Sequence, residues 1–271
     1  MPSRIPRVTK TAAIVLKHRR LGDADRIVTL LTPHRGKMDV VAKGLLRSRS
    51  KMAGHLEPLT LSEVVLAHGR SMDIVTQAQT VEPFSKLHGD LEQLSTAMYL
   101  LELADRFTVE HADALDVYEL LEVSLRRLAR GDGVALVTRR YELGLLAATG
   151  FQPELDNCLE TGEPVPAETA FWTNRGGGVV SEAGRAMHPE ALALDAQVLR
   201  VLRAYASLSY EEAGRIRIDP ELAGRLERVM HEFVRAQAER ELKSAEFVSE
   251  SRRVSLSSSS STPDDPSDKT D

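Results

Sequence analysis

Cysteine, aromatic residues and long apolar runs are all scarce in this sequence. Its 271 residues include one cysteine, Cys158, so no internal disulfide can form and a disulfide-stabilised extracellular scaffold is excluded. The apolar run at residues 14–16 leads directly into charged Lys17 and is too short for a signal sequence or a membrane span. Aromatic residues make up 4% of the chain, so a nucleic-acid site would depend on phosphate contacts more than on stacking. These shortages predict a cytoplasmic protein without a membrane partner.

Motifs for nucleotide-driven or hydrolytic chemistry are also missing. There is no G-x-x-x-x-G-K-[ST] sequence, and the glycines at 176–178 do not lie between a strand pattern and a helix pattern. The eight histidines lack metal-ligand spacing, and Cys158 has no histidine close to it in sequence. A hydrolase or transferase would have to use Asp23, Asp25 and His34, which form no complete catalytic group, and the two aspartates beside a glycine are more typical of a turn. We therefore do not expect an enzyme.

Charge of the two signs is segregated along the chain. The first 55 residues contain 13 Lys or Arg against three acidic residues, a balance of +10 in a chain whose total is −5. The remaining 216 residues contain 22 basic and 37 acidic side chains. Such segregation marks either the docking site of a polyanion or an ordinary solvated basic face. Which of these two interpretations applies depends on the strands and loops on which the basic residues lie.

The N-terminal part of the chain has the pattern of a small β-barrel. Apolar, β-branched runs recur between turn signals at residues 12–16, 27–31, 38–42, 59–66 and 72–81. Five short strands suggest a barrel that occupies residues 1–82. In the last strand, strict alternation would place Ile74 and Ala78 on one face and Val75 and Gln77 on the other.

The rest of the chain has a helical period, which makes the fold class α+β with several domains. One helix begins near residue 88 with an apolar stripe of Leu91, Leu94, Met98 and Leu101, and others are predicted through residue 150 and from 189 to 248. Residues 151–188 form a loop-rich insertion in this helical domain. The last helix begins at Asp219 and runs to about residue 247. The Ser-rich tail, 249–271, is predicted to be disordered.

The basic residues fall at strand ends and in loops of the predicted barrel. The segment 43–51 is a cationic loop between the third and fourth strands, although it also fits a disordered surface loop. A groove and its loops on such a barrel are where single strands bind, with Lys and Arg neutralising phosphates. The predicted nucleic-acid site consists of Lys17, Arg19, Arg20, Arg26, Arg35, Lys37, Lys43, Arg47, Arg49 and Lys51.

Several passages together resemble a known family, the bacterial recombination mediator RecO. No single passage is decisive, but their order and spacing are specific, and the resemblance extends to about Glu250. The passages include Gly22-Asp-Ala-Asp-Arg26, Arg35-Gly-Lys37, Tyr99-Leu-Leu-Glu-Leu103 and Gly150-Phe-Gln-Pro-Glu-Leu-Asp156.

The resemblance implies an OB-fold barrel, a helical domain and a zinc-ribbon-like insertion. It implies a non-enzymatic activity: binding single- and double-stranded DNA, annealing complementary strands coated by single-strand-binding protein, and acting with RecR to load RecA. We expect the C-terminal peptide of single-strand-binding protein to bind the helical domain, and the protein to be associated with the nucleoid. Candidate arginines for that peptide are Arg126, Arg127, Arg130, Arg139 and Arg140. The alternative is a nucleic-acid-binding assembly factor that does not anneal.

The insertion departs from the zinc pattern of many family members. Their two C-x2-C pairs fall here on Cys158, Thr161, Ser181 and Gly184, so one of four thiolates remains. We therefore expect a degenerate zinc ribbon without metal or cofactor. We expect apolar packing to hold it instead, through Phe171, Trp172, Val179 and Val180.

Overall fold

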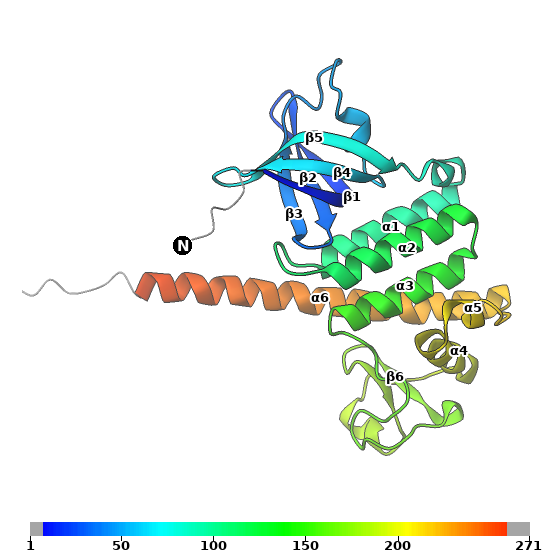
Figure 1. Cartoon of the computed structure of the whole chain (residues 1–271). Coiled ribbons are helices and arrows are strands. Elements are labelled where there is room, and N and C mark those ends of the chain that lie inside the picture. The colour runs from blue at the N-terminus through cyan, green and yellow to red at the C-terminus, as the bar shows by residue number, and fades with distance from the viewer. Residues whose placement is uncertain (1–7, 259–271) are drawn as a thin grey trace, which may run out of the picture.

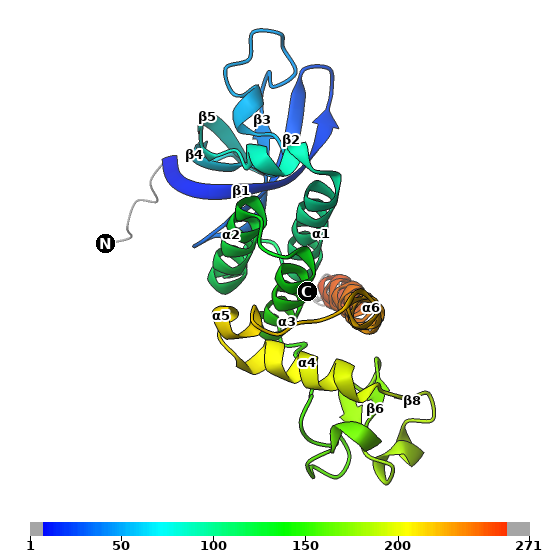
Figure 2. The same cartoon turned by 90° about the vertical axis from the view of Figure 1, so that its right-hand side faces the viewer.

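The computed structural model describes residues 8–258, with side chains up to Glu239. A five-stranded barrel lies at one end, a layer of helices in the middle, and a small β-containing insertion at the other end (Figures 1 and 2). The α+β class with an N-terminal five-stranded sheet followed by helices is confirmed. None of the described helices is both long enough and apolar enough to cross a bilayer.

The five strands close into a barrel in the order β1-β2-β3-β5-β4. Their core consists of alternating apolar residues such as Val15, Leu30 and Leu66, all fully buried. Neighbouring strands are antiparallel except β3 and β5, which pair in parallel through only two residues of β3, Val40 and Val41. The bounds are β1 Val8–Leu21, β2 Asp25–Thr32, β3 Gly36–Ala42, β4 Leu61–Ala67 and β5 Asp73–Glu82.

Strand β1 is much longer than the apolar run at 12–16 predicts. Its first half pairs with β4 and its second half pairs with β2, with a register shift between Val15 and Lys17. The shift lets one strand bend across two neighbours. The charged residues from Lys17 to Arg20 therefore continue the strand, because β2 supplies their backbone partners.

The strict alternation predicted for β5 is wrong in the middle of the strand. Val75 is 2% exposed and belongs to the barrel core, and the next core-facing residue is Ala78. The cause is a bulge, because Leu66 pairs with Val75 whereas Val65 pairs with Gln77. Thr76, which lies between them, has no residue opposite it on β4. The core-facing residues of β5 are therefore odd-numbered before the bulge, at Val75, and even-numbered after it, at Ala78.

The helical layer is built from α1, α2, α3 and α6, and α4 connects it to the insertion (Figure 2). The apolar stripe predicted for α1 is correct for Leu101, which is buried, and for Leu94, which packs against the core, and wrong for Leu91 and Met98, which are 82% and 42% exposed. A second stripe containing Leu100 and Ala104 is buried instead, because it faces the neighbouring helices and the barrel. The bounds are α1 Leu91–Phe107, α2 Leu115–Arg130, α3 Val134–Ala148, α4 Ala196–Ser207, α5 Tyr210–Ala213 and α6 Pro220–Ser258.

Helix α6 begins as predicted but ends later. The Asp219 side chain accepts a hydrogen bond of 2.8 Å from the Leu222 amide and caps the helix. No glycine or proline occurs between Gly224 and Pro263, and the helix continues to Ser258 rather than ending near residue 247. Residues 249–258 of the predicted disordered tail thus continue α6, and residues 259–271 lie outside the described part of the chain.

The insertion contains a three-stranded sheet that extends beyond the predicted end at 188. Its strands are β6 Phe171–Thr173, β7 Gly178–Val180 and β8 Leu192–Ala193, with β6 in the centre. Trp172, Val179 and Val180 are buried and Phe171 packs against the same core, as predicted. The Trp172 ring contacts the Phe233 ring of α6 with 5.1 Å between centroids, which attaches the insertion to the helical layer.

The connection between α1 and α2 runs beside the first half of β3, which is called its lower half below and lies before the residues that pair with β5. The His111 amide donates a hydrogen bond of 2.9 Å to the Lys37 carbonyl, and Glu110 forms a parallel bridge with Lys37. Gly36 begins β3 with φ of +58°, and a Cβ atom there would lie 1.8 Å from the Ala112 carbonyl oxygen. This connection therefore covers the part of β3 that does not pair with β5.

Candidate nucleic-acid interface

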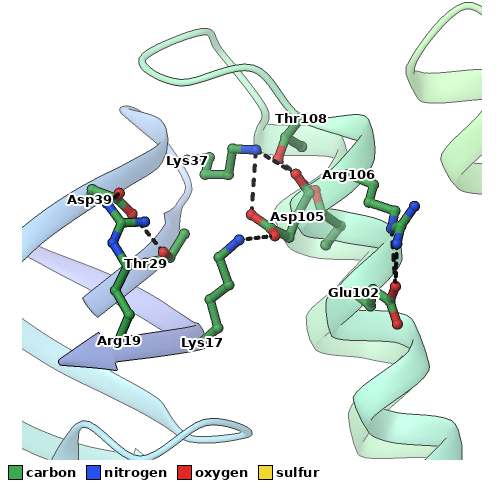
Figure 3. A network of polar contacts seen from close by, with 10 residues as sticks. Lys17, Arg19, Thr29, Lys37, Asp39, Glu102, Asp105, Arg106 and Thr108 are labelled. Carbon is green, nitrogen blue, oxygen red and sulfur yellow. Dashed lines mark hydrogen bonds and ion pairs between the residues drawn. The ribbon is translucent and has the colours of Figure 1, made fainter. Parts of the chain in front are cut away.

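Two of the ten predicted cations are held at the seam between barrel and helices. Lys17 of β1 and Lys37 of β3 both point to Asp105 in the last turn of α1 (Figure 3). Lys37 also donates to the Asp105 carbonyl, and its side chain is 14% exposed. The two ammonium groups share the single negative charge of the Asp105 carboxylate, so these lysines join two parts of the fold.

Three further predicted cations have partners that belong to the barrel strands themselves. Arg19 pairs with Asp39 at 2.7 Å, and Asp39 also accepts a 2.6 Å hydrogen bond from Thr29 (Figure 3). Arg35 pairs with Asp73 at 2.8 Å. Burial alone would raise the pKa of the Asp73 carboxyl, but hydrogen bonds from Arg35 and His68 bring it below the usual value. Arg26 contacts the His18 ring.

The remaining five predicted cations are exposed. Within residues 8–258 their side chains have no hydrogen bond or ion pair to another protein group. They belong to the end of β1 and to the loop between β3 and β4, at the end of the barrel far from the helices (Figure 1). These residues are Arg20, Lys43, Arg47, Arg49 and Lys51.

The loop that carries four of these cations is anchored, contrary to the reading of 43–51 as a disordered loop. Leu45 is 4% exposed and belongs to the barrel core. The Gly44 amide donates 2.7 Å to an Asp25 carboxylate oxygen, and the Leu46 amide donates 2.9 Å to the Ala24 carbonyl. The loop is therefore fixed beside the β1–β2 turn, and its arginines project from a supported backbone.

Arg70, in the β4–β5 turn, is a further exposed cation that the sequence reasoning missed. Its side chain has no partner among the described residues. The His68-Gly69-Arg70-Ser71 turn is visible in the sequence, but a charge count over the first 55 residues ends before it. In OB-type barrels the β4–β5 loop is one of the two loops that flank the oligonucleotide.

The structure does not assemble the alternative catalytic group. Asp25 accepts the Gly44 hydrogen bond and stabilises the loop. Asp23 lies in the β1–β2 turn and His34 in the β2–β3 turn. These turns are at opposite ends of β2, an eight-residue strand that spans about 25 Å.

Two neighbouring hollows lie where α2, α3, α4 and the start of the insertion meet. The first holds about 290 Å³, is lined by Val123, Arg127 and Arg140, and has no acidic residue among its described lining. The second holds about 450 Å³ and is lined by Glu154, Asp156 and Arg203, of which the last two pair at 3.1 Å. Their shared lining residues make them parts of one depression; these are Gln152, Pro153, Leu155 and Ala206.

The five candidate arginines of the helical layer differ in their surroundings. Arg127 pairs with Asp132 at 3.3 Å and Arg140 donates to the Leu208 carbonyl at 2.8 Å, whereas Arg130 is exposed and does not line the depression. Arg126 pairs with Glu82 and Glu122 at 2.9 and 2.7 Å. Arg139 pairs at 3.0 Å with Glu142, which is fully buried. Burial raises the pKa of the Glu142 carboxyl to about 7, although the Arg139 charge and a Tyr99 hydrogen bond oppose the shift.

Two family models match nearly all of the described chain. Recombination protein O N terminal matches residues 7–84, and Recombination protein O C terminal matches residues 88–246. The chain belongs to the RecO family. This membership assigns it to DNA repair and recombination.

Curated relatives of RecO type align along most of their own length. The DNA repair protein RecO of Heliobacterium modesticaldum is 36% identical over 242 residues, which is 88% of each chain. That of Roseiflexus sp. is 34% identical over 253 residues, 93% of this chain and 89% of the relative. That of Desulforudis audaxviator is 36% identical over 250 residues, covering 92% and 98%.

The four positions that the RecO resemblance assigns to zinc ligands lie together in the insertion. Cys158 is 2% exposed, and its Sγ accepts hydrogen bonds from the Ser181 amide and hydroxyl at 3.2 and 3.4 Å. A Cβ atom on Gly184 would lie 2.7 Å from the same sulfur. One thiolate among hydroxyl groups and a glycine does not fit a tetrahedral structural zinc site. Hydrogen bonds and close packing around Cys158 occupy this position instead.

The Gly184→Ala substitution is therefore expected to destabilise the insertion by about 1–3 kcal/mol, because the new methyl group overlaps the Cys158 sulfur. Adding Cys158→Ala removes the sulfur and is expected to recover much of that loss. Urea unfolding of the two single variants and the double variant measures the coupling. Additive losses would mean that the sulfur is not the obstacle.

Proposed function

We propose that this protein binds single- and double-stranded DNA, anneals complementary strands coated by single-strand-binding protein, and acts with RecR to load RecA. The carrying observation is the group of exposed, unpaired cations at the far end of the barrel: Arg20, Lys43, Arg47, Arg49 and Lys51. The strand order and the parallel β3–β5 contact support an OB-type barrel. Lys17, Arg19, Arg26, Arg35 and Lys37 remain part of the proposed basic surface. Carboxylate partners reduce the charge that Lys17, Arg19, Arg35 and Lys37 offer to phosphate, whereas Arg26 contacts the His18 ring.

Annealing by this surface requires no catalytic residue. Phosphates of two strands that are neutralised side by side repel each other less, and their local concentration rises. Base pairing then supplies the driving force. The acidic remainder of the chain, with 37 acidic against 22 basic side chains beyond residue 55, favours protein partners over a second DNA surface.

The depression in the helical layer is our proposed site for the C-terminal peptide of single-strand-binding protein. Arg127 and Arg140 supply positive charge beside apolar Val123 in the first hollow, which has no acidic residue among its described lining. Arg127 also pairs with Asp132 at 3.3 Å, and the acidic residues of the depression, Glu154 and Asp156, belong to the second hollow. The Arg127 guanidinium lies 3.4 Å from the centroid of the Tyr210 ring, which holds it at the rim. An acidic peptide with apolar residues fits this combination of charge and surface.

We propose the division of the chain into a barrel at 1–82, a helical domain at 83–150 and 189–248, and a degenerate zinc-ribbon insertion at 151–188. RecR is expected to contact this protein, RecA to be affected indirectly, and the protein to act at the nucleoid.

The Val123→Asp variant tests annealing and peptide recognition together. Val123 is 47% exposed, so the change repels an acidic peptide without disturbing the core. We expect annealing of coated complementary oligonucleotides to slow at least fivefold and annealing of bare oligonucleotides to remain unchanged. Val109→Asp is the control, because Val109 is 63% exposed and does not line the depression.

Two outcomes would contradict the proposal. Equal annealing by Val123→Asp and Val109→Asp on coated strands would remove the depression as the peptide site. Binding of DNA by the unchanged protein without faster duplex formation would favour the alternative, a non-annealing assembly factor.

A further inference from the structure

The barrel contains no phenylalanine, tyrosine or tryptophan. All 12 such residues of the chain occur at or after Phe84. Proteins that bind single strands without sequence preference combine a basic groove with aromatic side chains on which bases stack. This barrel has the first component and lacks the second.

Histidine rings do not replace the missing platform at the basic end. His18 contacts Arg26 and Glu57, and His55 is hydrogen-bonded to Thr80 at 2.8 Å. His68 contacts Asp73. The exposed His34 lies in the β2–β3 turn, at the other end of β2 from the loop that carries Arg47 and Arg49.

One edge of the sheet region that an OB-type barrel uses for oligonucleotides is also occupied. That face is formed by strands β2 and β3. Here the α1–α2 connection lies along the lower half of β3, through the His111–Lys37 hydrogen bond and the Glu110 bridge. Asp39 projects from the middle of β3 and places a carboxylate beside Arg19. A base laid across this face would meet a paired arginine and carboxylate and no aromatic ring.

We propose that the barrel holds nucleic acid through phosphates alone, with the bases directed outward and unstacked. The inference rests on the proposed DNA binding and specifies how that site recognises its ligand. The five unpaired cations contact the backbone, which single and double strands share, so the same residues serve both. Bases that no side chain stacks keep their pairing edges free, and the bound strand stays ready to pair with its complement.

An oligonucleotide without bases tests this directly. A 20-residue thymidine strand and an abasic strand with the same number of phosphates are titrated with the full-length protein at several salt concentrations, and binding is followed by fluorescence anisotropy. We expect the two dissociation constants to agree within about twofold and their salt slopes to be parallel. Loss of more than tenfold affinity for the abasic strand would overturn phosphate-only binding while leaving the proposed DNA binding intact.

Two variants complete the test, because an arginine guanidinium can itself stack on a base. Arg47→Lys/Arg49→Lys keeps both charges and removes the planar groups, and we expect it to bind both strands within about twofold of the unchanged protein. A tenfold loss confined to the thymidine strand would reveal arginine stacking and overturn the inference. Arg47→Ala/Arg49→Ala/Lys51→Ala is expected to lower the affinity for the thymidine strand and for the abasic strand by the same factor. Absence of binding to either strand by the unchanged protein would instead overturn the proposed function.

Discussion

Replacing Arg47, Arg49 and Lys51 together by alanine is expected to weaken single-stranded DNA binding about a hundredfold at 0.1 M salt. Each phosphate contact contributes about 0.7 to the slope of log affinity against log salt for single strands, so three lost contacts remove about 2 from that slope. Their side chains are exposed and unpaired within the described chain, so the change should not alter the barrel core. Titration between about 0.05 and 0.3 M salt measures both quantities.

A second triple variant, Arg215→Ala/Arg217→Ala/Arg228→Ala, controls for the loss of three positive charges. These arginines are exposed on the helical layer and have no side-chain partner among the described residues. We expect it to change affinity by less than about threefold, because long-range attraction is screened over about 10 Å at this salt. Equal effects of the two triple variants would exclude the loop as the site and favour a non-specific effect of net charge.

The Gly36→Ala substitution is expected to cost about 4 kcal/mol of unfolding free energy. An L-residue at φ of +58° costs about 1–2 kcal/mol, and the new Cβ would lie 1.8 Å from the Ala112 carbonyl oxygen. The α1–α2 connection must then move away from β3, which breaks the His111–Lys37 hydrogen bond. Urea unfolding monitored by circular dichroism measures the loss.

Gly22→Ala is the matched control for that substitution. Gly22 has nearly the same φ, +64°, but nothing lies within 4 Å of its Cβ position. We expect it to cost about 1–2 kcal/mol from the backbone alone. Similar losses of unfolding free energy for Gly22→Ala and Gly36→Ala would show that the overlap with the Ala112 carbonyl does not contribute to the destabilisation. Hydrogen exchange at the His111 amide reports directly whether its hydrogen bond to the Lys37 carbonyl is broken, even where Gly36→Ala lowers the folded fraction.

The local parts of the fold could be predicted from the sequence. The five strands, the Asp219 cap and the apolar packing of Trp172, Val179 and Val180 depend on residues close together in the chain or on a regular period. The α1 stripe was only partly predicted, because α1 carries apolar residues on more than one face, and its neighbours decide which of them are buried. The end of β1 was missed because its charged residues depend on pairing with β2.

The candidate site divides in the same way. The positions of Arg47 and Arg49 in a turn-rich loop follow from the local sequence, whereas the partners of the paired cations do not. Asp105 is 88 residues from Lys17 and 68 from Lys37, and no sequence pattern connects such distant charges. A count of basic residues therefore overstates the available positive charge, since acidic residues from later in the chain neutralise part of it.

The connection that runs beside β3 has a consequence for the barrel as a separate fragment. A piece of the chain ending at Glu82 would lose Glu110 and His111, and the lower half of β3 would become an open sheet edge. Exposed edges invite pairing between copies of a protein and lead to aggregation. The α1–α2 connection thus covers this edge in the full chain, and we expect it to prevent self-association of the barrel through β3.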